Sequence, residues 1–186
     1  MPAVDPVKYY NVPYEAMEPT IPRDTQVQGD RAYYFHNAPK RWDVVVFLAP
    51  EISRLGSELG KKRVTGAGKC IALINAAEEI YKEKQDIYRP QIYYVKRIVG
   101  LPGELIEFVG GAIEIDGKPL DIPTHLNQYK AVKHQTKNVY GSGSRFHIPA
   151  DSVFVMGDNL DLDVVDSRQC GPIPIGNLEA RVLQVQ

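Results

Sequence analysis

Lys96 is the residue of this chain whose surroundings could give it acid–base chemistry. It lies in the apolar run from Tyr93 to Val99, and desolvation in such a run lowers the pKa of a lysine, so that a neutral amine becomes available. A neutral amine can activate a serine hydroxyl, which is a poor nucleophile unless a base lies within hydrogen-bond reach. Composition alone favours the alternative, an ordinary strand lysine directed to solvent.

Two other stretches carry candidate polar chemistry, the proline-punctuated loop 12–21 (VPYEAMEPTI) and the run 157–168 (GDNLDLDVVDSR). Metal chemistry is not expected, because the histidines show no ligand-like spacing with cysteines or carboxylates. These histidines are His36, His125, His134 and His147. Gly66-Ala67-Gly68-Lys69 lacks the upstream glycine and the following Ser or Thr of a phosphate loop, so no nucleotide or other cofactor is expected either.

The elements that would position these residues are mainly β-strands. Alternating or continuous apolar runs of strand length predict strands at residues 7–12, 32–35, 42–48, 92–99, 104–109, 112–115, 152–156 and 180–185. Asp116-Gly117 predicts a tight hairpin, whereas residues 118–145 are polar and predicted irregular. Apolar residues at helical spacing predict one amphipathic helix, from about residue 69 to 84.

Composition excludes several classes of protein. The 186 residues are 44% hydrophobic and 24% charged, as in an ordinary globular chain, and the net charge of -1 gives no nucleic-acid footprint. No stretch approaches the ~18 apolar residues of a membrane span, and the N-terminus lacks the build of an export signal. The chain as written is therefore expected to be soluble, unless an upstream anchor has been removed. Two cysteines, Cys70 and Cys170, favour free thiols, although they could pair in an oxidising compartment.

Four separated stretches, in order and at similar spacing, resemble the type I signal peptidase family, the S26-type peptidases with a Ser-Lys dyad. They are residues 13–21, 41–47, 94–104 and 153–174. The resemblance covers nearly the whole chain after residue 7. It implies a mainly β fold of coiled antiparallel sheets. The β core would comprise residues 7–50 and 91–186, with a smaller β lobe around 104–150, and residues 51–90 would form an insertion that carries the helix.

The resemblance also assigns roles to individual residues. Lys96 takes the place of the general base, and Ala16 takes the place of the nucleophilic serine. The backbone N–H of Ala16 would still contribute to an oxyanion hole. Tyr14 falls where the family often has a second oxyanion donor, but its hydroxyl is too far from the backbone to replace that of a serine. The chain as written is therefore predicted not to cleave.

Other residues match supporting positions of the family. Those expected to brace the dyad are Asp158, Asn159, Asp166, Ser167 and Arg168. Those expected to shape the loop or the substrate groove are Pro13, Met17, Pro19, Thr20 and Tyr94.

The run 157–168 also departs from the family. Leu160 replaces an arginine, the approach to Asp166 is one residue longer, Asp163 or Val164 lies where a lysine-orienting serine is usual, and Cys170 replaces an aromatic residue. A negative Asp163 beside Lys96 would favour the charged amine, which cannot act as a base. Several coordinated departures favour a natural non-peptidase over an engineered mutant, so Ala16→Ser alone is not expected to restore cleavage.

The function implied by the family is removal of signal peptides from exported preproteins at the extracytoplasmic face of the membrane. Signal peptides and a membrane surface are the expected partners, with no nucleic acid and no metal. The substrate would bind in extended form between the strand around Val12-Pro13 and the strand before Lys96. Two alternatives stay open: a non-catalytic peptide-binding or assembly factor, and a maturation peptidase of conjugative transfer with the same fold.

Overall fold

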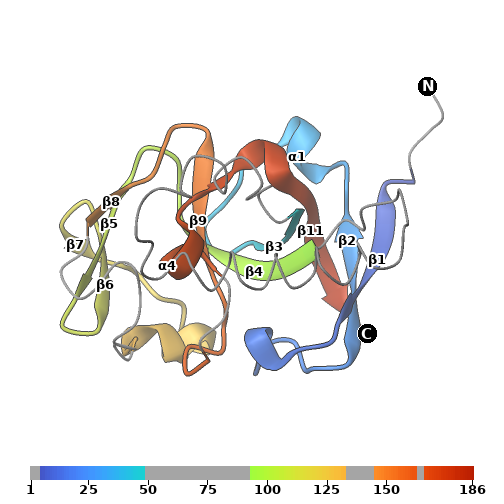
Figure 1. Cartoon of the computed structure of the whole chain (residues 1–186), viewed down its shortest axis with the longest axis horizontal. Coiled ribbons are helices and arrows are strands. Elements are labelled where there is room, and N and C mark those ends of the chain that lie inside the picture. The colour runs from blue at the N-terminus through green and yellow to red at the C-terminus, as the bar shows by residue number, and fades with distance from the viewer. Residues whose placement is uncertain (1–4, 49–92, 133–144, 163–165) are drawn as a thin grey trace, which may run out of the picture.

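The computed structural model of the chain describes residues 5–48, 93–132, 145–162 and 166–186. These residues form two sheets in which every strand pair is antiparallel (Figure 1). The larger sheet has the strand order β1-β2-β11-β3-β4-β9-β10, and the smaller has the order β7-β6-β5-β8. The predicted mainly β fold is confirmed.

The strands of the larger sheet are β1 (Val7–Val12), β2 (Thr25–Asp30), β3 (Val44–Leu48), β4 (Tyr93–Gly100), β9 (Ser152–Met156), β10 (Ile173–Pro174) and β11 (Leu178–Val185). The strands of the smaller sheet are β5 (Leu105–Val109), β6 (Ala112–Ile115), β7 (Lys118–Pro119) and β8 (Arg145–His147). Short helical turns connect them: η1 (Glu15–Met17), α1 (Tyr33–His36), η2 (Thr124–Lys130), α4 (Ser167–Cys170) and η3 (Ile175–Asn177).

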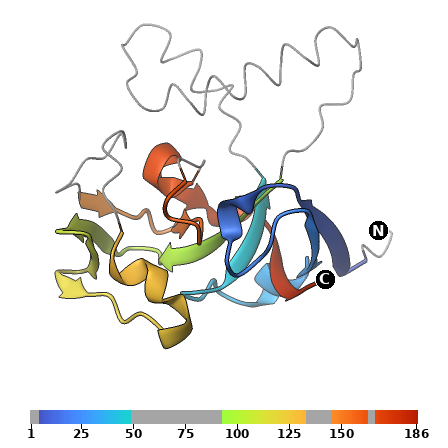
Figure 2. The ribbon, with the colours of Figure 1, turned by 90° about the horizontal axis from the view of Figure 1, so that it is seen from below.

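The smaller sheet lies at one end of the molecule, while β1, β2 and the C-terminus lie at the other, as Figures 1 and 2 both show. β4 runs between the two ends and continues through residues 101–104 into β5. β4 carries Lys96, so the candidate site lies on the strand that connects the two ends of the molecule.

A buried apolar cluster joins η1 to the larger sheet. Its members come from β1, η1 and its following loop, β2, β3, β4 and β11: Tyr10, Val12, Met17, Ile21, Val27, Val46, Val95 and Ala180. Met17 and Ile21 are almost fully buried in it. Each large apolar side chain buried in this way stabilises the fold by about 1.5–3 kcal/mol, which fixes the short turn η1 against the sheet.

Three strand predictions hold in full. Residues 7–12, 112–115 and 152–156 form β1, β6 and β9 with the predicted bounds. The Asp116-Gly117 hairpin is confirmed, since φ is 52° at Asp116 and 73° at Gly117, as a two-residue type I′ turn requires. The predicted strands at 92–99, 104–109 and 180–185 are also present, with slightly shifted ends.

Two strand predictions were wrong in part. Residues 32–35 lie in a helical turn, α1, rather than a strand, because Asp30 Oδ1 accepts the N–H of Ala32 at 2.8 Å and turns the chain as β2 ends. The strand predicted from Trp42 begins at Val44, since Trp42 has a φ of 73° that no strand residue adopts.

Two further observations concern the predicted connections. The segment 118–145, predicted irregular, includes β7 and η2 in its described part. The predicted helix at 69–84 and the whole of residues 51–90 lie outside the described residues. No helix among the described residues is long and apolar enough to cross a membrane.

Cys170 is disulfide-bonded, so the expectation of a free thiol at this position was wrong. Sequence spacing carries no distance information, which is why pairing could not be inferred. Cys70 lies outside the described residues.

Candidate functional site

Ala16 lies in the short turn η1, directly after β1, and is half-buried. Met17 anchors the turn in the core. Asn159 holds it from the other side, because its backbone N–H donates to the carbonyl of Ala16 and its Nδ2 donates to the carbonyl of Glu15, both at 3.2 Å. The loop is therefore held in place by contacts that do not involve the side chain of residue 16.

Lys96 lies in β4, which packs against η1, and its side chain is only 3% exposed. Burial lowers the pKa of the Lys96 amine to about 8, and Asp166 and Asp158 offset part of that lowering while Arg168 adds to it. Its Nζ donates to the carbonyl of Val95 at 3.0 Å. The alternative of an ordinary solvent-facing lysine is thus excluded.

Asp158 is the centre of a buried hydrogen-bond network. Arg97 binds it in bidentate fashion, with Nε 2.8 Å from Oδ1 and Nη2 2.6 Å from Oδ2. Tyr129 donates its hydroxyl to Oδ1 at 2.8 Å, and Thr20 donates to Oδ2. Charge-assisted bidentate bonds are the strongest of their class, so Asp158 ties together the loop after η1, strand β4 and η2.

Arg97 also reaches Trp42, whose carbonyl accepts from Nη1 at 2.8 Å. The indole of Trp42 packs edge-to-face on Tyr129, with ring centroids 5.6 Å apart. These contacts hold Trp42 in its left-handed backbone conformation. The network around Asp158 therefore extends to the start of β3.

Asp166 and Arg168 form the second buried ion pair. Their side chains are joined by several hydrogen bonds, the shortest 2.7 Å from Nη2 to Oδ2. Asp166 also accepts the N–H of Gly157 and that of Arg168, and the latter bond caps α4. Ser167 accepts the N–H of Val155 at 2.9 Å. The segment 166–168 is thereby fixed behind β9.

The predicted supporting residues thus lie around β4, on the loop after η1, on the segment after β9 and on α4.

Tyr14 is different, because it is 72% exposed. It interacts electrostatically with Tyr94, whose pKa is raised by burial and by the Tyr14 hydroxyl. Pro13 and Pro19 are exposed on the same loop, whereas Leu160 is buried beside Trp42. Asp163 and Val164 lie outside the described residues.

Arg97 and Tyr129 were not predicted as site residues. A signal for Arg97 was present in the sequence, since it is a second charged residue beside Lys96 in an apolar strand. Neighbouring residues of a strand point to opposite faces. Burial of both charges therefore requires polar partners on each face of the strand. Tyr129 lies in a segment predicted irregular, and nothing in its immediate sequence pointed to Asp158.

The outer edge of β1 has unpaired backbone groups. The carbonyl of Pro6 accepts from the N–H of Arg31. In this register, hydrogen-bonded pairs recur at every second residue, so Lys8, Tyr10 and Val12 face β2 with their backbone groups. Because antiparallel pairs alternate in this way, the N–H and C=O groups of Tyr9 and Asn11 point away from β2. No described strand pairs with them.

β4 has a second open edge, at its first half. Ile98 donates to the carbonyl of Asp43, so the same alternation directs the backbone groups of Tyr93 and Val95 away from β3. β9 pairs with β4 only from Arg97 onwards. Val95 therefore has no strand partner on that side among the described residues.

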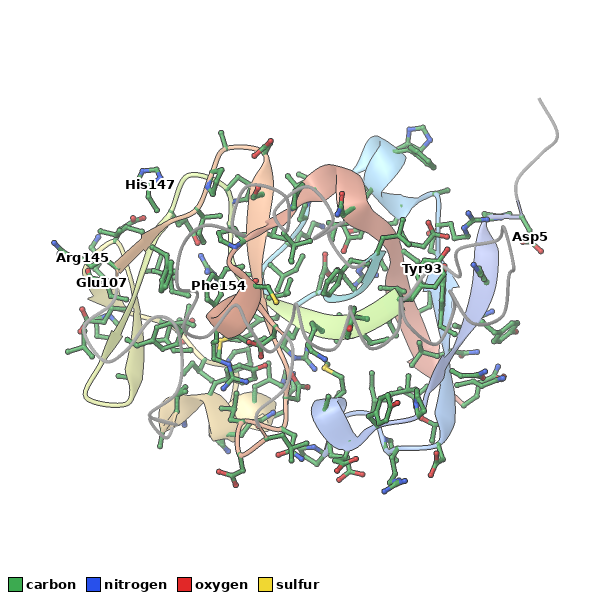
Figure 3. All side chains as sticks on the ribbon, viewed as in Figure 1. Asp5, Tyr93, Glu107, Arg145, His147 and Phe154 are labelled. Atoms are coloured by element: carbon green, nitrogen blue, oxygen red, sulfur yellow. The ribbon has the colours of Figure 1, made fainter. Side chains whose placement is uncertain are left out.

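The two open edges lie close together. The rings of Tyr10 and Tyr93 meet edge-to-face with centroids 5.3 Å apart, and Val12 and Val95 share one core cluster. Figure 3 labels Tyr93 at the end of β4 next to β1 and β2, far from Glu107 on the smaller sheet. An extended peptide lying between these two edges could pair with both of them.

Comparison with known proteins identifies the family. Residues 3–185 match the family described as signal peptidase, peptidase S26. The chain is 26% identical over 172 residues to signal peptidase I of Leptolyngbya laminosa, covering 92% of this chain and 64% of that protein. It is 36% identical over 78 residues to signal peptidase I of Bacillus amyloliquefaciens, covering 42% of this chain and 40% of that protein.

A plant relative and a solved structure extend the comparison. The chain is 23% identical over 171 residues to thylakoidal processing peptidase 1 of Arabidopsis thaliana, covering 92% of this chain but 39% of that protein. It also aligns with the crystal structure of a signal peptidase I from Enterococcus faecalis, with a TM-score of 0.44 and 20% identity, covering 80% of this chain and 98% of that chain. This chain belongs to the signal peptidase family, peptidase S26.

Proposed function

We propose that this member of the signal peptidase family binds the signal peptides of exported proteins without cleaving them. One observation carries the proposal: Asn159 holds the loop of Ala16, the residue that the family resemblance puts at the nucleophile position, and the buried Lys96 lies on strand β4, which packs against that loop. The binding apparatus and the reactive group are thus separable, and at residue 16 the reactive hydroxyl is absent.

The lack of cleavage follows from elementary chemistry. The methyl group of Ala16 has no lone pair with which to attack a carbonyl, so a covalent acyl intermediate cannot form there. Lys96 has no hydroxyl on residue 16 to deprotonate, and its amine bonds to the carbonyl of Val95 instead. The exposed Tyr14 offers no second oxyanion donor at the turn.

Peptide binding would proceed by strand addition. The N–H and C=O groups of Tyr9 and Asn11 on β1, and the N–H of Val95 on β4, have no strand partner among the described residues. An extended peptide that pairs with both edges would satisfy these groups, and main-chain hydrogen bonds of this kind give affinity without requiring one particular sequence.

The proposed location is the extracytoplasmic face of a membrane, where signal peptides emerge. The disulfide of Cys170 supports it, because such bonds persist in oxidising compartments. The chain spans 64% of the length of the Leptolyngbya relative and about 40% of the Bacillus and Arabidopsis relatives. Attachment to a membrane is a further part of the proposal.

A labelled synthetic signal peptide tests both halves of the proposal. We expect saturable binding by fluorescence anisotropy and no cleavage product by mass spectrometry. N-methylation of the peptide at alternate residues should weaken binding in either phase of the alternation, because one row of peptide N–H groups would face β1 and the other would face β4. Absence of saturable binding, or cleavage by the unaltered chain, would overturn the proposal.

The Ala16→Ser variant distinguishes two explanations for the expected lack of cleavage: the loss of one hydroxyl, or wider changes of the site. We expect Ala16→Ser to bind the peptide as the unaltered chain does and to cleave it weakly at most. Strong cleavage by this single variant would show that the remaining apparatus is intact, and the chain would then be a signal peptidase inactivated at one residue.

A further inference from the structure

Lys8 connects the two open edges of the larger sheet. It lies in β1, and its Nζ donates to the hydroxyl of Tyr93 in β4 at 3.4 Å. The same ammonium lies over two aromatic rings, 4.5 Å from the ring centroid of Tyr93 and 5.0 Å from that of Tyr10. Because a cation is attracted to the face of an aromatic ring, these contacts hold the side chain of Lys8 between β1 and β4.

The ammonium of Lys8 is accessible to a ligand. Its side chain is 39% exposed. Glu179 of β11 lies nearby, but its Oε1 accepts from Arg31 Nε at 2.7 Å and from the Tyr10 hydroxyl at 3.3 Å, whereas Lys8 Nζ is 4.0 Å away. A carboxylate that approached Lys8 from the open side could therefore form a closer, charge-assisted hydrogen bond than Glu179 does.

Lys8 lies toward the end of these edges that is farther from Ala16. β1 and β4 run in the same direction, because four successive antiparallel pairings separate them in the sheet. Tyr10 meets Tyr93 near this end, and β1 continues from there through Val12 toward Ala16. A peptide lying between the two edges would thus pass Lys8 several residues away from the point where it passes Ala16.

Only every second side chain of such a peptide would face Lys8. The side chains of Lys8, Tyr10 and Val12 point to one face of the sheet, because they alternate along β1 with those of Tyr9 and Asn11. An extended peptide alternates in the same way. Side chains that share a face interact across neighbouring strands, and opposite charges in such pairs are favourable while like charges are unfavourable.

We propose that Lys8 makes the site selective for peptides that carry an acidic side chain at the position facing its ammonium. The proposal rests on the peptide-binding function proposed above and specifies one residue of the ligand. An aspartate or glutamate at that position pairs with Lys8, whereas a lysine or arginine is repelled. An apolar side chain there would take water away from the ammonium without supplying an acceptor, which is unfavourable.

A series of synthetic peptides tests this inference. One residue of a signal-peptide analogue is made glutamate, glutamine or lysine, and the substituted position moves along the peptide one residue at a time. We expect one position at which glutamate binds about three- to five-fold more tightly than glutamine by fluorescence anisotropy, as for a partly exposed ion pair, and at which lysine binds more weakly than glutamine. The positions on either side of it should show a smaller preference, because their side chains point to the opposite face.

Variants of the chain assign the preference to one residue. In Lys8→Met, glutamate and glutamine at the selective position should bind equally. Lys8→Arg, which keeps the positive charge, should keep the preference for glutamate. Lys118→Met, which removes an exposed lysine from β7 of the smaller sheet, should behave as the unaltered chain does.

The outcomes separate the two proposals. Saturable binding with no preference for glutamate at any position, or a preference that persists in Lys8→Met, would overturn the role of Lys8 and leave peptide binding intact. Failure of every peptide to bind would overturn both. If Lys8→Met does not fold, Lys8→Gln provides a second neutral variant, and the same loss of preference is expected in it.

Discussion

Replacing Lys96 by methionine should stabilise the folded chain at neutral pH. The amine has a pKa of about 8 in the fold, against 10.5 in the unfolded chain, because burial disfavours its charged form. That interval corresponds to about 3 kcal/mol. Below pH 8 both states are protonated, so the fold bears the whole cost of the buried charge. Between pH 8 and 10.5 the unfolded chain binds more protons, and stability rises with pH.

The assay is urea unfolding of the unaltered chain and of Lys96→Met between pH 6 and pH 10, followed by circular dichroism. Methionine fills the space of the lysine stem, so a constant offset between the two curves is expected from packing. The informative quantity is the part of the difference that depends on pH. We expect Lys96→Met to lose most of an advantage of about 3 kcal/mol as the pH rises from 7 to 10. A difference that stays flat over this range, or one that grows, would refute a buried amine of low pKa.

Two further predictions concern the scaffold. Asp158→Asn should lower the free energy of unfolding by about 3 kcal/mol or more, because it leaves the guanidinium of Arg97 buried and uncompensated. Glu107→Gln, which breaks the pair with the exposed Arg145, should cost much less in the same urea titration. Similar losses in both variants would contradict the central place of Asp158. Gly29→Ala should cost about 1–3 kcal/mol, since a Cβ there would lie 2.8 Å from the Cβ of Ala180 and 2.9 Å from Cε2 of Tyr10, whereas at Gly176 nothing lies within 4 Å and Ala should be tolerated. Equal melting temperatures for these two glycine variants would show that β2 can move away from its neighbours.

The sequence predicted the parts of the fold that depend on local pattern. Runs of strand-forming residues placed β1 and β9, alternation placed β6, and Asp116-Gly117 placed the hairpin, because strand propensity, period-2 burial and turn chemistry are local properties. The family resemblance pointed to Lys96 and the segment 166–168, and the structure brings Asp166 and Arg168 near the Lys96 amine. Their roles stay predictions.

The rest depended on contacts between distant residues. Tyr129 meets Asp158 across 29 positions, and Trp42 takes a left-handed backbone next to the bonds that Arg97 makes to its carbonyl. Neither contact leaves a local signature. α1 was misread for the opposite reason: its aromatic residues favour strands, but the carboxylate of Asp30 turns the chain first. Local preference is weak where a side chain can bond to the backbone beside it.

The cost of the buried amine also bears on ligand binding. A buried ammonium that lowers stability by about 3 kcal/mol at neutral pH is a liability in the free chain, and a ligand that relieved this cost on binding the folded chain would gain affinity from the relief. The family resemblance puts Lys96 at the place of a general base, and a base must first lose its proton. At Ala16 there is no hydroxyl for such a base to deprotonate, so the low pKa of Lys96 serves no proton transfer from that residue.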